Sequence, residues 1–524
     1  MYYPATAGTI GDMLTASASR WPRLVAAEDD KTRLTYAELD KLTDDYARVL
    51  MERGITRGLH TGIWCANTLN DLVAFLAVSK LGAIPVMING ELTVKELSRL
   101  LRLSDTDVLL CGDGFRGNAF RDACPALRQA GLLREHIYIG GDVNALPMEE
   151  SAASEKALAA MRGAVLPEDT ATLLFTSGTS EGRPRAVMTS HRSWVLNAAS
   201  QAGALWADSR DRFYAAVPMF HCFGLCSCVL AALSVGARLC FPPDKSSRTT
   251  MEFIQSRQIT VLHGVPTMYH AIIAKDYLSS YDISSLRIGI IGGDTYTPSQ
   301  FMEIRKKLNF NLVPGLGLTE ATGGISHASP DDDVSILSTT VGRFSENLEG
   351  RIQDRETGRI QPVGQVGEIC VRGYSVMQGY YKDPESTARV LEPDGWLHTG
   401  DLGYLDQSGY LHFAGRLKEV IIRGGENISP GEVEGCISQL QQIDEVKVIG
   451  VPSRHFGEEV CACVSLRPGE EADGETVIAF VRDHLAKFKV PKYVLFFDQL
   501  PRTGNGKYDC NALRRMAEQQ IGET

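Results

Sequence analysis

Four polar segments occur in a fixed order along most of this chain, and each contains side chains suited to chemistry on phosphate groups. They span residues 176–185, 315–320, 395–401 and 501–507. In order, they offer small hydroxyl residues with an arginine, a threonine–glutamate pair, an aspartate in a glycine-rich stretch, and a late lysine. Any one of them could be a surface loop. Together they would supply what ATP-driven activation of a carboxylic acid needs: a phosphate cradle, a metal carboxylate, a ribose carboxylate and a mobile cation.

The first segment follows the apolar run 173–175, which we expect to be a buried strand. Small residues let backbone N–H groups approach an oxyanion, and hydroxyl and guanidinium groups add donors and charge. It is not a Walker loop, because no Gly-Lys-Ser/Thr follows the glycines. A flexible Gly/Ser turn is the alternative reading of this segment taken alone. The candidate ATP-binding residues here are Thr176, Ser177, Gly178, Thr179, Ser180, Gly182 and Arg185.

The second and third segments supply carboxylates. Glu320 could hold Mg²⁺ against phosphate oxygens, because hard cations prefer oxygen ligands; alternatively, Thr319 and Glu320 simply start a helix. Asp401 has several acceptor sites and could bind two vicinal ribose hydroxyls, or it could be an ordinary turn aspartate. Arg416 could reach ribose or phosphate, or could be a solvated surface charge.

The fourth segment places Lys507 in a Pro/Gly-rich stretch near the C-terminus. An ammonium on a mobile loop can bridge a carboxylate oxygen and the α-phosphate. Since that reaction brings two anions together, a cation present in the transition state lowers its barrier. Taken alone, Lys507 would be an exposed lysine; the other three segments favour the catalytic interpretation.

A histidine and three cysteines lie close together in the segment 221–228. Zinc sites usually have paired ligands at regular spacing and a second pair elsewhere, and neither is present. We therefore expect small thiol residues packed inside a helix, with His221 lining a pocket.

Composition limits the class of protein and its partners. A chain of 524 residues favours two or more domains, and 44% hydrophobic with 22% charged residues is typical of globular proteins. A net charge of −11 without a basic block argues against nucleic acid or an anionic membrane as the main partner. The 12 cysteines contain no CxxC pair, residues 1–10 lack a signal peptide, and no apolar run reaches ~18 residues. We expect a cytoplasmic protein without membrane insertion.

Apolar runs and helical spacing alternate in the first part of the chain. The runs 61–65, 108–112, 171–175 and 288–293 read as buried strands between amphipathic helices such as 72–81, which indicates an α/β domain with a mainly parallel sheet. After about residue 340, short glycine-rich elements such as 364–373 indicate antiparallel β structure. From about residue 419 we expect a small α+β unit with strands at 446–451, 460–466 and 494–497 and a helix at 476–487. Residues 147–168 read as a surface connection.

These segments resemble the adenylate-forming superfamily, which comprises acyl- and aryl-CoA synthetases, peptide-synthetase adenylation domains and beetle luciferases. The resemblance runs from residues 34–39 to Lys507 and includes 218–221, 379–381 and 415–418 in order. It implies a large N-terminal domain of two packed α/β halves plus a distorted β-barrel, followed by a small mobile α+β domain. The expected division is 1–417 and 418–524, with Lys418 as the hinge.

The resemblance also implies two half-reactions and a role for each candidate. A carboxylate attacks the α-phosphate of Mg·ATP to give acyl-AMP and pyrophosphate; the small domain then rotates and a thiol attacks acyl-AMP. Lys507, Glu320 and Thr319 would be catalytic, with Glu320 on Mg²⁺, and Asp401 and Arg416 would hold ribose. Adenine would lie among Gly293, Asp294, Gly315, Leu316, Gly317 and Leu318. The acyl and thiol pocket would include His221, Phe223, Gly292, Gly317, Gly323, Gly424 and Gly425.

The segment 424–434 resembles the CoA-synthetase form, His221 stands where amino-acid-activating domains carry a nearby Asp, and no carrier domain follows residue 524. We therefore expect an acid:CoA ligase, as a monomer or homodimer, that uses ATP, Mg²⁺ and coenzyme A. The first alternative is a stand-alone adenylation enzyme that loads a carrier protein in trans. The others are a nucleotide-binding regulatory relative without catalysis and luciferase-like oxidation.

Three positions depart from the family pattern. Arg185 replaces the usual Lys, so that a planar fork takes the place of a point charge. Glu181 lengthens the same loop by one residue and adds a negative charge near the phosphates. Leu316 replaces the aromatic residue that stacks on adenine, which loses ~0.5–1.5 kcal/mol. These changes bear on ATP affinity rather than on mechanism. Small residues at 323 and 324 suggest room for a ring or a medium chain.

Overall fold

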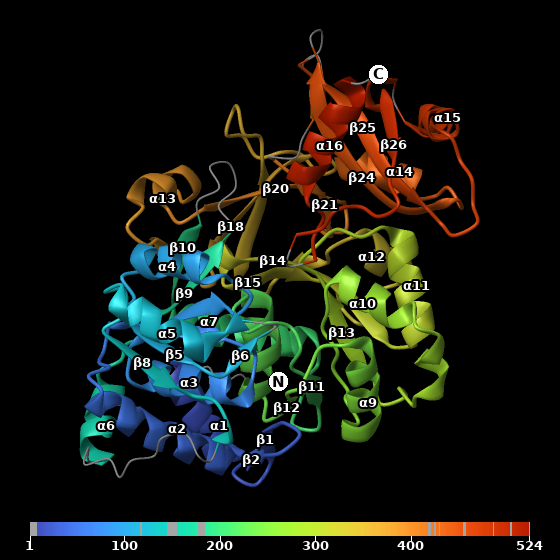
Figure 1. Ribbon diagram of the computed structural model, residues 1–524. Helices are drawn as coiled ribbons and strands as arrows, with labels where there is room; N and C mark the ends of the chain where they lie inside the picture. Colours follow the sequence, from blue (N-terminus) through green and yellow to red (C-terminus); the bar gives the residue numbers. More distant parts are fainter. Residues whose placement is uncertain are drawn as a thin grey trace.

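The computed structural model describes residues 8–115, 118–143, 155–176, 184–417, 421–423, 426–428, 430–453, 457–485, 487–503 and 506–522. A large α/β body forms the lower part of Figure 1, and the C-terminal elements lie above it. No helix in these ranges is both long enough and apolar enough to cross a lipid bilayer.

The first sheet of the body has the strand order β19-β10-β9-β4-β3-β5-β8. Its strands from β8 to β9 run parallel, whereas β10 and β19 are antiparallel additions at one edge. The strands are β3 (His60–Cys65), β4 (Ile84–Asn89), β5 (Val108–Cys111), β8 (Glu135–Tyr138), β9 (Thr170–Thr176), β10 (Arg185–Ser190) and β19 (Gly379–Tyr380), and a small ribbon of β6 (Gly114–Phe115) and β7 (Asn118–Ala119) lies apart.

Helices pack around this sheet. Three of them begin with a capping box, in which Thr35, Thr68 or Thr93 exchanges hydrogen bonds with an acidic residue three positions on. Every residue of α3 is buried, because this helix packs against other helices as well as against strands. The helices are α1 (Ile10–Arg20), α2 (Tyr36–Glu52), α3 (Leu69–Lys80), α4 (Val94–Leu103), α5 (Phe120–Gln129), α6 (Glu155–Gly163) and α7 (His191–Ala204). The expected surface connection 147–168 therefore contains a helix.

The second half of the body is built on the sheets β11-β12-β1-β2 and β13-β14-β15-β16, which Val261 connects through parallel bridges to Phe213 and Ile288. Buried side chains of both halves form one core cluster, so the halves pack as one body. The strands are β1 (Val25–Glu28), β2 (Arg33–Thr35), β11 (Arg212–Tyr214), β12 (Arg238–Cys240), β13 (Ile288–Ile291), β14 (Asn311–Leu318), β15 (Gly323–His327) and β16 (Arg343–Phe344). The helices are the π-helix η2 (Phe223–Leu230), α8 (Ala231–Ser234), α9 (Ser247–Arg257), α10 (Pro266–Ile273), η3 (Asp276–Ser280), α11 (Pro298–Leu308), η4 (Thr319–Ala321) and α12 (Val334–Thr339).

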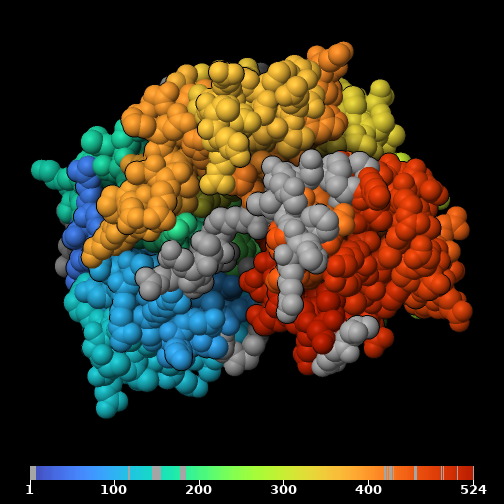
Figure 2. Space-filling view, turned by 90° about the horizontal axis from the view of Figure 1, so that it is seen from above, coloured from blue at the N-terminus to red at the C-terminus, as the bar shows by residue number. Residues whose placement is uncertain are grey.

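An antiparallel sheet follows, with the order β17-β18-β20-β21, and its core cluster also includes Val187, Ala321, Ile325 and Tyr380 of the body. It consists of β17 (Leu348–Gln353), β18 (Gly367–Gly373), β20 (Leu397–Leu405) and β21 (Leu411–Arg416), with α13 (Pro384–Val390) beside it. Seen from above, its yellow and orange elements form one side of the molecule, next to the red C-terminal elements (Figure 2).

The C-terminal elements form a sheet of order β23-β22-β25-β24, with β26 parallel to β25, and two further core clusters. They are β22 (Ile421–Arg423), β23 (Glu426–Ile428), α14 (Pro430–Ile437), β24 (Ile443–Ser453), β25 (Gly457–Leu466), α15 (Gly474–His484), η5 (Lys487–Lys489), β26 (Tyr493–Phe496) and α16 (Cys510–Gly522). The predicted fold class is confirmed: a mixed α/β body precedes a small α+β unit. The expected helix 476–487 ends earlier, at His484, because Leu485 is extended.

Candidate active site

Two parallel strands end side by side at the centre of the site. The register of β13 and β14 pairs Ile291 with Pro314, so Gly292, Gly293 and Asp294 follow one strand next to the last four residues of the other. A Cβ atom on Gly292 would lie 2.9 Å from the carbonyl oxygen of Gly315, and Gly293 has a φ of +81°. Both positions thus suit glycine. Ligands of open α/β sheets bind at this end of the strands.

The strand β14 runs directly into Thr319 and Glu320, which begin the short helix η4. A Cβ atom on Gly317 would lie 2.6 Å from the carbonyl oxygen of Gly323, so β14 and β15 can approach closely only because this position lacks a side chain. Gly323 itself has a φ of +112°. Leu316 and Leu318 pack against the core of the antiparallel sheet. This places the predicted phosphate and metal residues next to the predicted adenine residues.

A chain of polar contacts connects the metal candidate with the phosphate loop. The hydroxyl of Tyr380 donates a hydrogen bond of 2.9 Å to Oε1 of Glu320. The guanidinium of Arg185 lies 5.3 Å from the ring centre of Tyr380, and its Nε is 3.7 Å from a carboxylate oxygen of Asp383. Burial, followed by the charge of Glu320, raises the pKa of Tyr380, so its hydroxyl remains a donor. Sequence reasoning included residue 380 in a matching motif but gave it no role.

The predicted phosphate loop joins β9 to β10. These strands form an antiparallel pair in which Thr176 faces Arg185, so the two ends of the loop lie next to each other. The candidates Ser177, Gly178, Thr179, Ser180 and Gly182, and the inserted residue 181, lie outside the described residues, as do Lys418, Gly424 and Gly425.

Asp401 and Arg416 face each other across β20 and β21. The Nε atom of Arg416 is 3.3 Å from Oδ1 of Asp401, whose side chain is only 6% exposed, while the arginine side chain is 53% exposed. A buried carboxylate beside an exposed cation leaves the pair accessible from the arginine side. The predicted ribose residues are thus neighbours.

Lys507 extends from the C-terminal unit toward this site. Its carbonyl oxygen accepts a hydrogen bond of 2.8 Å from the backbone of Thr503, which shapes the turn that carries it. Burial and then the charge of Arg416 lower the pKa of the ammonium, while Asp294, Cys222 and Asp401 oppose that shift. Protein atoms surround the ammonium, but the residue as a whole keeps much of its surface in solvent, as expected for a group that projects into an open cleft.

A cleft of about 210 Å³ lies next to Lys507, between the C-terminal unit and the body. Its walls come from both: Pro266, Thr267, His270, Asp294, Thr295 and Gln300 from the body, and Glu445, Arg502 and Tyr508 from the C-terminal unit. Asp294 lines this cleft and also interacts electrostatically with Lys507, so the cleft borders the site.

Phe223 begins the π-helix η2, and His221 lies two residues before it; this irregular helix type is frequent at functional sites. Burial, with smaller effects from Lys507 and Lys245, lowers the pKa of His221 to about 4, so the imidazole is neutral at pH 7. The ring of Phe223 lies 5.8 Å from that of His263.

Cys222 is a site residue for which sequence reasoning predicted no role at this site. The hydroxyl of Thr319 donates to its Sγ at 3.8 Å, and burial raises the pKa of this thiol to about 11. Its position between two predicted site residues, His221 and Phe223, was the available signal. The segment 221–228, which we expected to pack small thiol residues inside a helix, thus contributes one thiol to the site. Cys226 and Cys228 are buried in the helix.

Comparison with known proteins agrees with this geometry. The family described as AMP-binding enzyme matches residues 14–381, and the AMP-binding enzyme C-terminal domain matches residues 432–507. The chain belongs to the AMP-binding enzyme family. The predicted membership of the adenylate-forming superfamily is therefore confirmed.

Relatives within the AMP-binding enzyme family match over almost their full length. The putative acyl-CoA synthetase YngI of Bacillus subtilis (strain 168) is 35% identical over 536 residues, covering 97% of this chain and 96% of that protein. The mitochondrial medium-chain acyl-CoA ligase ACSF2 of Danio rerio is 31% identical over 547 residues, covering 99% and 90%. The crystal structure of ATP-bound MatB from Rhodopseudomonas palustris superposes with a TM-score of 0.85 at 27% identity, covering 97% of this chain and 99% of that one.

Proposed function

We propose that this protein is an AMP-forming acid:CoA ligase, which activates a carboxylic acid with ATP and transfers the acyl group to the thiol of coenzyme A. The observation that carries the proposal is the convergence of Lys507, from the C-terminal unit, with Asp294, Asp401 and Arg416 of the body. A cation brought close to a potential ribose carboxylate is what the attack of one anion on another requires. The names of the curated relatives point to the same chemistry.

In the first half-reaction, Asp401 accepts hydrogen bonds from the ribose hydroxyls. Arg416, whose Nε is 3.3 Å from Asp401, contacts the ribose or the α-phosphate. Lys507 bridges the attacking carboxylate and the α-phosphate and stabilises the negative charge that accumulates between them. The adenine lies against Gly293 and the end of β14. Glu320 offers a hard oxygen donor of the kind Mg²⁺ prefers, and a bound Mg²⁺ would neutralise phosphate charge there.

The second half-reaction needs a different arrangement, because the lysine must leave before a thiol can approach. We propose the domain boundaries 1–417 and 418–524, with rotation at Lys418. The acyl group and the thiol would pass His221, Phe223, Gly292, Gly317 and Gly323 on the body, and Gly424 and Gly425 on the rotated unit. Rotation lets one cleft serve two transition states with different charge.

The test is pyrophosphate and AMP release over a panel of aliphatic, aryl and carnitine-like acids, with and without coenzyme A. Acid-dependent pyrophosphate release, followed by AMP and thioester formation when coenzyme A is added, is the expected result. A parallel arm with candidate carrier proteins separates the ligase from an enzyme that loads a carrier in trans. Purified protein that never forms AMP with any acid would end the proposal. The cytoplasmic location and the monomeric or homodimeric state remain predictions from the sequence.

A further inference from the structure

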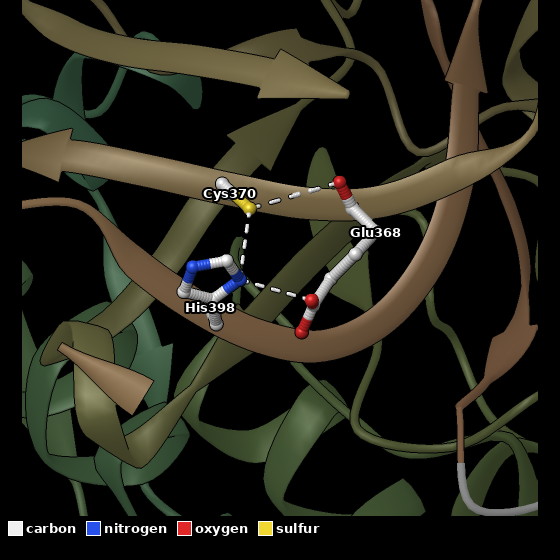
Figure 3. A group of neighbouring side chains, drawn as sticks. All are labelled: Glu368, Cys370 and His398. Carbon is white, nitrogen blue, oxygen red and sulfur yellow. Dashed lines mark hydrogen bonds and ion pairs between the residues drawn. The ribbon is translucent and has the colours of Figure 1, made fainter. Parts of the chain in front are cut away.

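A cluster of three chemically versatile side chains lies between β18 and β20, beside Asp401 but outside the mechanism above. Figure 3 shows Glu368 and Cys370 on one strand and His398 on the next, with their polar atoms turned toward one another. The Nδ1 atom of His398 is 2.9 Å from Oε2 of Glu368 and 3.5 Å from Sγ of Cys370. On the other side of the ring, Nε2 lies 2.7 Å from Oε1 of Glu392.

The strand pairing is irregular at this cluster. Cys370 pairs with His398 and Glu368 pairs with Leu402, so the single residue Ile369 faces the three residues 399–401. The extra residues of β20 bulge out of the ladder, which Gly400 permits with its φ of +73°. Asp401 is the last residue of this bulge. The position of its carboxylate therefore depends on whatever holds the bulge in shape.

Two side chains replace the missing ladder hydrogen bonds. The backbone N–H of Gly400 donates to Oε1 of Glu368 at 3.0 Å. The hydroxyl of Thr399 donates to the carbonyl of Ile369 at 2.7 Å and accepts from the backbone N–H of Asp401 at 3.1 Å. A half-buried N–H without an acceptor costs stability, so the Glu368 carboxylate helps to hold this bulge in shape.

We propose that His398 is a positioning residue for Asp401. By donating to one oxygen of Glu368, it orients the carboxylate so that the other oxygen receives the N–H of Gly400 and holds the bulge that presents Asp401 to the ribose. This inference rests on the proposed function, in which Asp401 binds the ribose hydroxyls.

The charges of the cluster fit a positioning role. The imidazole lies between two carboxylates, and Glu392 is also bound by Arg351 at 2.9 Å. Two carboxylates are thus matched by an imidazolium and a guanidinium. Contacts with Cys370 and Glu368, followed by Glu392, raise the pKa of His398 to about 11, so the ring is charged throughout the pH range of ordinary assays.

The same donor set could also bind zinc, because zinc accepts Cys, His and carboxylate ligands. The donors already have protein partners, however. Sγ of Cys370 is 3.7 Å from Oε1 of Gln353, and both nitrogens of His398 contact carboxylates. Elemental analysis of the purified protein separates the two cases. One equivalent of metal that is lost in Cys370→Ser would overturn the proposal, because the cluster would then be a metal centre.

The main experiment compares ATP with 2′,3′-dideoxy-ATP, which lacks both ribose hydroxyls. For each variant the measured quantity is kcat/KM for ATP divided by kcat/KM for the analogue, from pyrophosphate release. Asp401→Ala defines how much of the wild-type discrimination the carboxylate provides. We expect His398→Gln to lower the discrimination at least tenfold, through poorer use of ATP, while use of the analogue changes little. General loss of folded enzyme would lower both nucleotides equally and leave the ratio unchanged.

The chain offers a matched control in His412 on β21. Its Nε2 lies 3.1 Å from Asp406, so it too is a histidine–carboxylate pair on this sheet, but it pairs with Tyr404, three residues beyond the bulge. His412→Gln should keep the wild-type ratio. Glu392→Gln removes the negative charge of the outer partner of His398, which Arg351 also contacts, and should give an intermediate ratio. This variant keeps the test decisive if His398→Gln does not fold.

The possible failures point to different assumptions. Wild-type discrimination in both His398→Gln and Glu392→Gln, with discrimination lost in Asp401→Ala, would overturn the positioning role alone. Wild-type discrimination in Asp401→Ala would remove the ribose assignment on which the inference rests. Absence of acid-dependent pyrophosphate release in the wild type would contradict the proposed function itself.

Discussion

Removing the ammonium of Lys507 is the most direct perturbation of the proposed mechanism. Two unit charges 4 Å apart interact by about 4 kcal/mol at an effective dielectric constant of 20, a value suited to a group in a solvent-exposed cleft. At about 1.4 kcal/mol for each factor of ten, this is close to a thousandfold in rate. Arg416 stays beside the site and compensates for part of the lost charge. We therefore expect Lys507→Ala to slow acyl-AMP formation by about 10²- to 10³-fold, the range found when one transition-state donor is removed.

The assay separates the two half-reactions. Acid-dependent pyrophosphate release measures adenylation, and thioester formation from synthetic acyl-AMP with coenzyme A measures the second step. Lys507→Ala should largely spare the second step, because the lysine leaves the site before the thiol arrives. Lys492→Ala is the matched control: it removes a lysine of the same unit whose ammonium lies 3.6 Å from Glu459, and both steps should stay near wild type.

The same residue has a pH signature. Burial and Arg416 lower the pKa of Lys507, so the free enzyme loses this charge at a lower pH than ordinary lysine does. The value of kcat/KM for ATP, which reports the free enzyme, should fall as pH rises through the lowered pKa. Lys507→Arg should lack this fall, because a guanidinium stays charged.

Equal losses in both half-reactions of Lys507→Ala would refute the reasoning, since the lysine would then support the fold or both steps alike.

Three further predictions follow from individual contacts. Tyr380→Phe removes the hydroxyl bound to Glu320, a hydrogen bond to a charged group worth about 1.5–3 kcal/mol. Mg²⁺ titration of pyrophosphate release should show at least a tenfold loss of apparent Mg²⁺ affinity. Tyr381→Phe, whose hydroxyl bonds to Asp105 instead, should be near normal. Asp401→Ala should raise KM for ATP more than tenfold with little change in KM for the acid, in steady-state assays. Burial lowers the pKa of His263 to about 4, so unfolding takes up a proton between pH 6.5 and 4 and stability falls there as pH falls, by about 1.4 kcal/mol per unit. His263→Gln should lack this contribution. In chemical denaturation, the difference in unfolding free energy between the wild type and this variant should therefore become smaller at pH 5.

Much of the fold and of the candidate site followed from local pattern. The predicted run 288–293 begins with a buried strand, Ile288–Ile291, and Asp294 just after the run lines the cleft. The reason is general: parallel strands buried on both faces read as continuous apolar runs, and the loops at their carboxyl ends meet at one edge of the sheet. The helix within 147–168 was missed because Leu158 is the only buried residue of α6, so the segment shows no clear apolar face.

Contacts between distant segments were beyond that reasoning. Nothing local to Tyr380 indicates that its hydroxyl reaches Glu320, 60 residues earlier, because that contact depends on how β19 joins the edge of the first sheet. Likewise, residue 368 reads as part of a glycine-rich β segment and residue 398 as part of a polar segment, and nothing local predicts the register in which one residue faces three.

The order and chemistry of the polar segments were determined by the sequence alone, since glycine, carboxylate and lysine side chains can be read directly and each follows a recognisable element. Which of those side chains touch, and which residues hold them in place, was decided by the tertiary structure. Strand register and the packing of the C-terminal unit depend on free energies summed over many long-range contacts, so no short stretch of sequence specifies them.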